Sequence, residues 1–119
     1  MAENAQVDNF IMEFSVAVQR AMKVRSLYAQ LEKQRYCKTW SAEQLVQGFV
    51  GDVGDLAKII MAKEGYRAAE NVDAKLAHEL ADCLWSVIVL ANAYDVDLES
   101  AFTSTMDELE KQIIGAIGE

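Results

Sequence analysis

The chain has 119 residues, of which 52% are hydrophobic, and it carries a formal net charge of −8 at pH 7. This length and composition predict one folded domain spanning residues 1–119 and exclude a disordered chain. The acidic balance argues against binding to nucleic-acid polymers, because their phosphates need a basic surface. A free nucleotide stays compatible with this charge, because bound cations can bridge its phosphates to acidic side chains.

The sequence also predicts a cytoplasmic protein with no membrane partner. The N-terminal segment lacks the basic and continuous apolar regions of a signal peptide. The longest nearly apolar run, residues 83–91, is far shorter than the ~20 residues that cross a bilayer. Cys37 and Cys83 have no metal-binding spacing, so two free thiols in a reducing compartment are expected.

Long helices are expected throughout, since the chain contains no proline and only six glycines. The first helix is predicted over residues 4–34, where apolar residues recur three and four positions apart. The second begins after Ser41, a good N-cap with Gln44 in position for a capping box. It should end near Lys63 and Glu64, with Gly65 as the C-terminal cap.

The third helix is predicted over residues 73–94, opened by Asn71 or Asp73, and it is apolar on nearly all sides. In so small a chain, such a helix indicates that a second subunit covers its extra face. A fourth helix follows, capped by Asp97. The predicted fold is therefore all-α: a four-helix bundle-like protomer that oligomerises through its third helix.

Two pairs of acids interrupt these apolar helices. Asp52 and Asp55 lie in the segment "GDVGD" of the second helix, and Glu79 and Asp82 lie in "HELAD" of the third. Residues three apart on a helix are neighbours, so each pair is vertical, and side-by-side packing would bring all four carboxylates to one seam. Such a quartet favours Mg²⁺, with Mn²⁺ as an alternative, because hard cations prefer carboxylate oxygens. The acids are equally compatible with solvated helix faces, so spacing alone leaves both interpretations open.

The segments "GFVGDVGDLAKII" and "KLAHELADCLWSVIVLANAYDVDLESAF" resemble the MazG-like all-α nucleoside triphosphate pyrophosphohydrolases over residues 40–110. The family signature is Glu-Glu-x-x-Glu on one helix and Glu-x-x-Asp on the next. Here Asp replaces Glu at positions 52 and 55, and Gly51 takes the place of the first Glu. These departures leave the number of bound ions open.

The resemblance implies an enzyme that converts an NTP or dNTP to the monophosphate and pyrophosphate, with a role in nucleotide-pool cleaning. It implies that the quartet of Asp52, Asp55, Glu79 and Asp82 is catalytic and holds Mg²⁺. It also implies a homodimer or homotetramer with sites at the subunit junctions. This agrees with the extra apolar face of the third helix.

Several residues are weaker candidates for substrate contacts, each with a structural alternative. Lys58 could meet phosphates or remain a solvated charge. Trp40 could stack on a base or staple the start of its helix, and Trp85 could line the base pocket or pack in the core. Asn92 could bind a base or sugar, or cap its helix. Three further cations near predicted loops could contact phosphates, although the pattern does not single them out: Arg35, Lys38 and Arg67.

Two alternative functions stay open at this stage. One is a dUTPase-like relative with the same fold and metal but a different substrate. The other is a catalytically silent oligomeric helical module that binds a partner, with its acids merely solvated. His78 is expected at the surface or at an interface rather than as a catalytic base.

Overall fold

The computed structural model describes residues 13–118 and contains four helices with no strand in that span. They are α2 (Phe14–Tyr36), α3 (Ala42–Lys63), α4 (Val72–Ala93) and α5 (Leu98–Gly118). The predicted all-α class is confirmed, and the predicted helix limits agree to within about two residues wherever they can be compared. The predicted start of the first helix, at residue 4, lies outside the described residues.

The helix ends follow the local signals in the sequence. The Ser41 side chain accepts a hydrogen bond from the Gln44 backbone N–H, and the Gln44 side chain accepts one from the Ser41 N–H, which completes the capping box. Gly65 follows α3 with φ +87°, a conformation that glycine adopts without steric cost. Asn71 is the residue at the N-cap of α4, and Asp97 accepts a backbone hydrogen bond at the start of α5.

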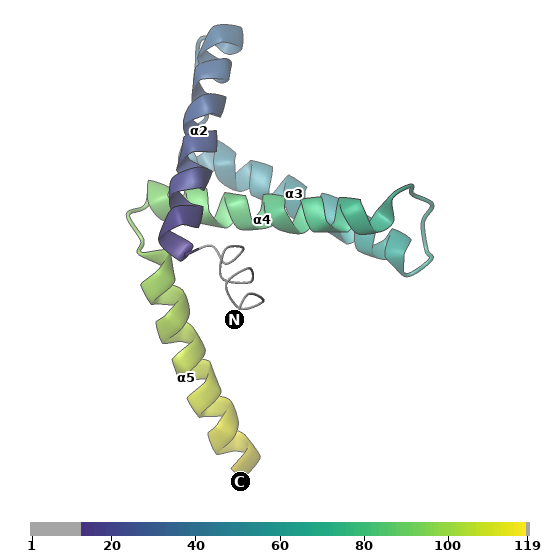
Figure 1. Ribbon diagram of the computed structural model, residues 1–119, viewed down its shortest axis with the longest axis vertical. Coiled ribbons are helices and arrows are strands. Elements are labelled where there is room, and N and C mark those ends of the chain that lie inside the picture. Colours follow the sequence, from purple (N-terminus) through teal and green to yellow (C-terminus); the bar gives the residue numbers. More distant parts are fainter. Residues whose placement is uncertain (1–12, 119) are drawn as a thin grey trace, which may run out of the picture.

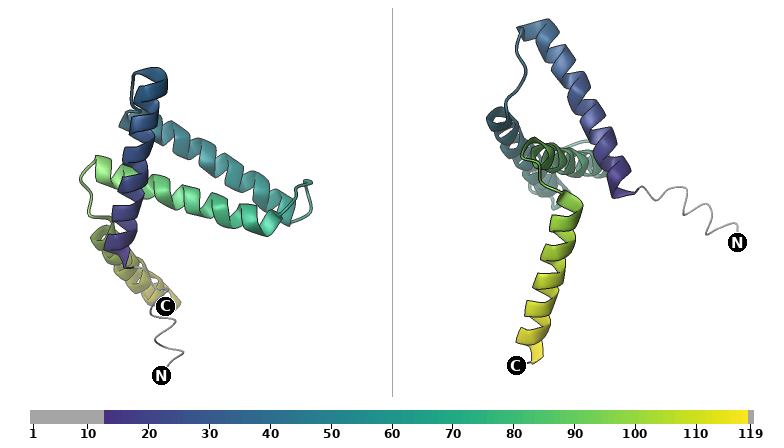
Figure 2. Two further views of the ribbon diagram at one scale, coloured as in Figure 1. Left: turned by 45° about the horizontal axis from the view of Figure 1, so that its top comes forward. Right: turned by 90° about the vertical axis from the view of Figure 1, so that its left-hand side faces the viewer.

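Helices α3 and α4 pack side by side and antiparallel, and α2 crosses them (Figures 1 and 2). Two polar contacts join α3 and α4. Ser86 donates to Asp52 over 3.0 Å near one end, and Lys63 pairs with Asp73 over 2.6 Å near the other. The bundle-like contacts of this protomer therefore join α2, α3 and α4.

Helix α5 points away from the other three helices (Figure 1). Most of its surface is accessible, including an apolar stripe in which Phe102 is 59% exposed and Ile113 is 57% exposed. Within the described span, the buried hydrophobic residues are few: Ala21, Ile59, Ile88 and Val89. The radius of gyration is 18.2 Å, compared with about 13 Å for a compact domain of this length. One protomer thus leaves much of its apolar surface uncovered.

By length and composition alone, α4 meets the criteria for a membrane-spanning helix. It is also the central helix of this fold, because it contacts both α2 and α3. An apolar core helix has the same length and hydropathy. Its contacts with α2 and α3 account for part of this composition, since 17% of its apolar window is buried within the protomer.

Candidate functional site

The seam between α3 and α4 contains the predicted acidic quartet. On the α3 side, Asp52 accepts a hydrogen bond from the hydroxyl of Ser86, which is 5% exposed. Because Ser86 belongs to α4, this bond joins the two helices at the acid itself. Asp55 lies one helical turn further along α3 and is exposed.

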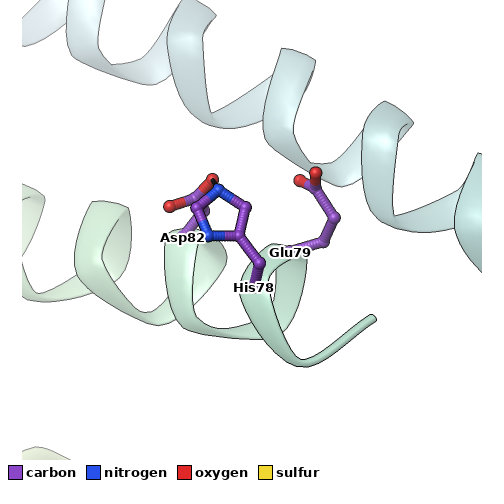
Figure 3. A group of neighbouring side chains, drawn as sticks. All are labelled: His78, Glu79 and Asp82. Atoms are coloured by element: carbon purple, nitrogen blue, oxygen red, sulfur yellow. Dashed lines mark ion pairs between the residues drawn. The ribbon is translucent and has the colours of Figure 1, made fainter. Parts of the chain in front are cut away.

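On the α4 side, Glu79 and Asp82 direct their carboxylates toward the neighbouring helix (Figure 3). Each of these residues and His78 offers one ligand atom within 4.8 Å of the others. Glu79 Oε2 is buried, and no group among the described residues hydrogen-bonds to it. Asp82 Oδ2 lies 3.1 Å from Nε2 of the exposed His78. A buried carboxylate oxygen without a partner is unfavourable. A cation bound at Glu79 Oε2 would supply the missing interaction.

The Cys83 thiol lies within electrostatic reach of acids from both helices. Burial, together with the negative charges of Asp52, Glu79 and Asp82, raises the pKa of the Cys83 thiol. A negative charge nearby disfavours the thiolate. Asp52 of α3 is thus within electrostatic reach of the same thiol as the two acids of α4.

The quartet divides between two cavities along the seam. Asp52 and Asp82 line a cavity of about 480 Å³, and Asp55 and Glu79 line one of about 230 Å³. The group of ligand atoms within 4.8 Å contains Glu79 and Asp82 but neither acid of α3. The structure therefore brings the four acids to one seam in two neighbouring pairs.

The larger cavity lies where α2, α3 and α4 meet, and an ion pair of α2 holds one of its walls. Glu32 accepts hydrogen bonds from Arg25 at 3.0 Å and from the Trp40 backbone N–H at 2.8 Å. Arg25 also donates to the Trp40 carbonyl at 3.1 Å. Burial acts to raise the pKa of Glu32, but these two donors outweigh it and hold that pKa below its ordinary value. Both backbone polar groups of Trp40 are thereby fixed by one ion pair.

Both tryptophans considered in the sequence line this larger cavity. Trp40 lies against Gly48, where a Cβ atom would come within 3.0 Å of the indole. Trp85 donates its indole N–H to the Ala21 carbonyl and packs edge-to-face on Tyr28. Two aromatic side chains are therefore held in place beside Asp52 and Asp82.

The remaining predicted substrate contacts lie elsewhere. Lys58 lines the smaller cavity together with Asp55 and Glu79. Asn92 lines a separate cavity of about 220 Å³, formed where the start of α2 meets the link between α4 and α5. Within this chain, the structure does not bring Asn92 together with the tryptophans or the acids.

Sequence reasoning missed several residues of the seam. Ser86 lies four residues after Asp82, on the same helix face, so this spacing was a usable signal. His78, expected at the surface or at an interface, is exposed and lies four residues before Asp82. Arg25 and Glu32 lie seven apart on α2, which also places them on one face. Their contact with Trp40 depends on the chain reversal after α2, which no local pattern in the sequence predicts.

Comparison with known proteins adds two findings. Residues 40–112 match the MazG nucleotide pyrophosphohydrolase domain. The chain is also similar to the "Gene 37 protein" of Mycobacterium phage L5, with 35% identity over 72 residues. That match covers 57% of this chain and 62% of the phage protein. Both pairs of acids and Trp40 fall within the matched domain.

Proposed function

The chain belongs to the MazG nucleotide pyrophosphohydrolase family, and from this premise we propose that it hydrolyses a (deoxy)nucleoside triphosphate to the monophosphate and pyrophosphate. The observation that carries the proposal is the seam of carboxylates beside a cavity walled by two tryptophans. Clearing surplus nucleotides from the cytoplasm is the cellular role that we propose for this activity.

The chain's own donor set fits a hard divalent cation. Asp52, Asp55, Glu79 and Asp82 would hold Mg²⁺, or Mn²⁺ in its place, through carboxylate oxygens. The unpartnered Glu79 Oε2 supports this assignment, because a cation would supply its missing interaction. His78 would stay outside the ligand set and orient Asp82 through its 3.1 Å contact. When bound, the cation neutralises phosphate charge and makes a bound water more acidic.

The reaction we propose is an attack by water on the α-phosphorus. The oxygen of water forms the new P–O bond, and the bond between the α-phosphorus and the bridging oxygen breaks. Pyrophosphate leaves with that electron pair, and a carboxylate of the quartet takes the proton from water. The apolar walls of the larger cavity, Trp40 and Trp85, would hold the base by stacking.

We also propose that the active form is a homodimer or homotetramer. The described protomer exposes 9527 Å², compared with roughly 6,400 Å² for a compact monomer of this mass. Leu80 and Leu84 of α4 are 52% and 55% exposed, and the stripe of α5 is uncovered. A second copy would bury these surfaces, because exposed apolar patches of this extent mark interaction sites. Sedimentation should give a mass of two or four chains, and a monomer at micromolar concentration would contradict this proposal.

A product assay tests the proposed reaction. The full chain is incubated with Mg²⁺ and a panel of ribo- and deoxyribonucleoside triphosphates, and products are separated by anion-exchange chromatography. We expect equimolar monophosphate and pyrophosphate, with the activity lost on chelation and reduced at least 100-fold in Glu79→Gln. Release of orthophosphate, or no release from any nucleotide, would contradict the proposal. Glu43→Gln serves as a matched control that should retain most activity, because Glu43 is an exposed acid in the first turn of α3 and lines neither cavity of the seam.

A further inference from the structure

The smaller cavity on the seam is unusual for so acidic a chain, because three cations line it. They are Lys58 from α3, Arg67 from the loop after α3, and Lys75 from the first turns of α4. All three are exposed. Asp55 and Glu79 form the acidic wall of the same cavity. We name this the basic cavity. It joins cationic side chains to two members of the carboxylate quartet.

None of these three cations forms an ion pair with a described residue, although Asp55 and Glu79 line the same cavity. The ion pairs among the described residues are Arg25 with Glu32, Lys63 with Asp73, and His78 with Asp82. None of them includes a cation of the basic cavity. Lys63 is close in sequence to Lys58 and is already engaged by Asp73, which raises the pKa of Lys63. The cations of the basic cavity therefore lie beside the carboxylate seam without ion-pair partners, where they can attract an anionic substrate.

The order of groups along the seam indicates the orientation in which a nucleotide would bind. Trp40 and Trp85 line the larger cavity with Asp52 and Asp82. The basic cavity follows along α3, and Lys58 lies six residues beyond Asp52, about 9 Å at the helical rise. The tryptophans and the free cations thus lie on opposite sides of the acids.

We infer that the basic cavity binds the pyrophosphate end of the nucleotide, with Lys58, Arg67 and Lys75 contacting the β- and γ-phosphates. This inference rests on the proposed function. Arginine and lysine recognise phosphate oxygens through charge-assisted hydrogen bonds. The cavity consequently selects triphosphates over diphosphates, because a diphosphate lacks the γ-phosphate, one of the two groups that these cations contact. The base points in the opposite direction, toward Trp40.

Binding of inorganic pyrophosphate tests this inference without catalysis. Titration calorimetry with Mg²⁺ present compares the full chain, the double variant Lys58→Met/Arg67→Met, Lys75→Met, and the matched control Lys63→Met. We expect the pyrophosphate Kd to rise at least tenfold in the double variant and at least threefold in Lys75→Met. It should change less than twofold in Lys63→Met. Affinity for the nucleoside monophosphate should stay within twofold in every variant, because its base and α-phosphate lie outside the basic cavity.

Failure of this inference differs from failure of the proposed function. If pyrophosphate does not bind the unaltered chain, or binds the double variant equally well, the proposed role of the basic cavity is contradicted, even if nucleotides are hydrolysed. Equal weakening for pyrophosphate and monophosphate also overturns it. Selective weakening supports the cavity even when no nucleotide is turned over. The charge-preserving variant Lys58→Arg/Arg67→Lys should restore binding to within threefold, and circular dichroism checks that each variant is folded.

Discussion

Replacing Glu32 with Ala tests whether the ion pair behind the larger cavity stabilises the fold and orients Trp40. The substitution removes acceptors for Arg25 and for the Trp40 N–H, which lie 3.0 and 2.8 Å away. The Arg25 and Glu32 side chains are only 13% and 14% exposed. Breaking a buried pair costs about 3–5 kcal/mol, and hydrogen bonds to charged groups contribute about 1.5–3 each. With partial access of solvent, we expect a loss of about 2–3 kcal/mol.

The assay is chemical denaturation followed by circular dichroism at a fixed protein concentration, with thermal melting as a second measurement. The loss corresponds to roughly 8–12 °C in Tm for a domain of this size. Asp73→Ala is the matched control, because it removes the exposed pair with Lys63. Exposed pairs contribute little, so this control should melt close to the unaltered chain. Equal effects of the two substitutions would refute the reasoning, since burial would then not matter.

The pH dependence of the free energy of unfolding tests the same ion pair independently. Because the pKa of Glu32 in the folded protein is lowered, its contribution is fully present above its ordinary value of 4.5. The contribution is lost as the pH falls through the folded-state pKa, since the unfolded chain then binds more protons. The stability difference between the unaltered chain and Glu32→Ala should therefore be constant near pH 7 and shrink below pH 4.5. A difference that grows on acidification would contradict the ion pair.

Three further substitutions test other parts of the structure. Ser86→Ala removes the donor to Asp52, so we expect the free energy of unfolding to fall by about 1 kcal/mol. Calorimetry should also show weaker Mg²⁺ binding, and an unchanged Mg²⁺ affinity would show that the hydroxyl does not orient Asp52. Gly48→Ala places a Cβ 3.0 Å from the indole of Trp40, so tryptophan emission and nucleotide KM should change while the melting temperature is nearly retained. Gly65→Ala forces a φ of +87° on a residue with a Cβ. Chemical denaturation should therefore show a free energy of unfolding that is lower by about 1 kcal/mol.

The glycines beside the first acidic pair have no explanation in the packing of this chain. A Cβ atom built at Gly51 or Gly54 would contact nothing within 4 Å. In a helix interior each glycine costs about 0.5–1 kcal/mol relative to alanine. No packing contact among residues 13–118 offsets this cost.

The sequence by itself determined the helices and the composition of the site. Capping residues such as Ser41 and Asp97 form hydrogen bonds with backbone groups a few positions away, so the helix ends could be predicted from short stretches of sequence. The pairing of Asp52 with Asp55, and of Glu79 with Asp82, follows from helical geometry alone. The domain match over residues 40–112 agrees with the resemblance seen in those motifs.

Only the tertiary structure decided which residues meet across helices. The separation of Asn92 from the tryptophans, and the contact of Arg25 and Glu32 with Trp40, depend on how α2 crosses α4 and on the loop that follows it. The departure of α5 from the bundle depends in the same way on the short link after α4. Crossing angles and loop paths arise from packing over the whole chain, and similar apolar stripes allow several of them. Local periodicity therefore specifies the faces of the helices, whereas packing specifies their neighbours.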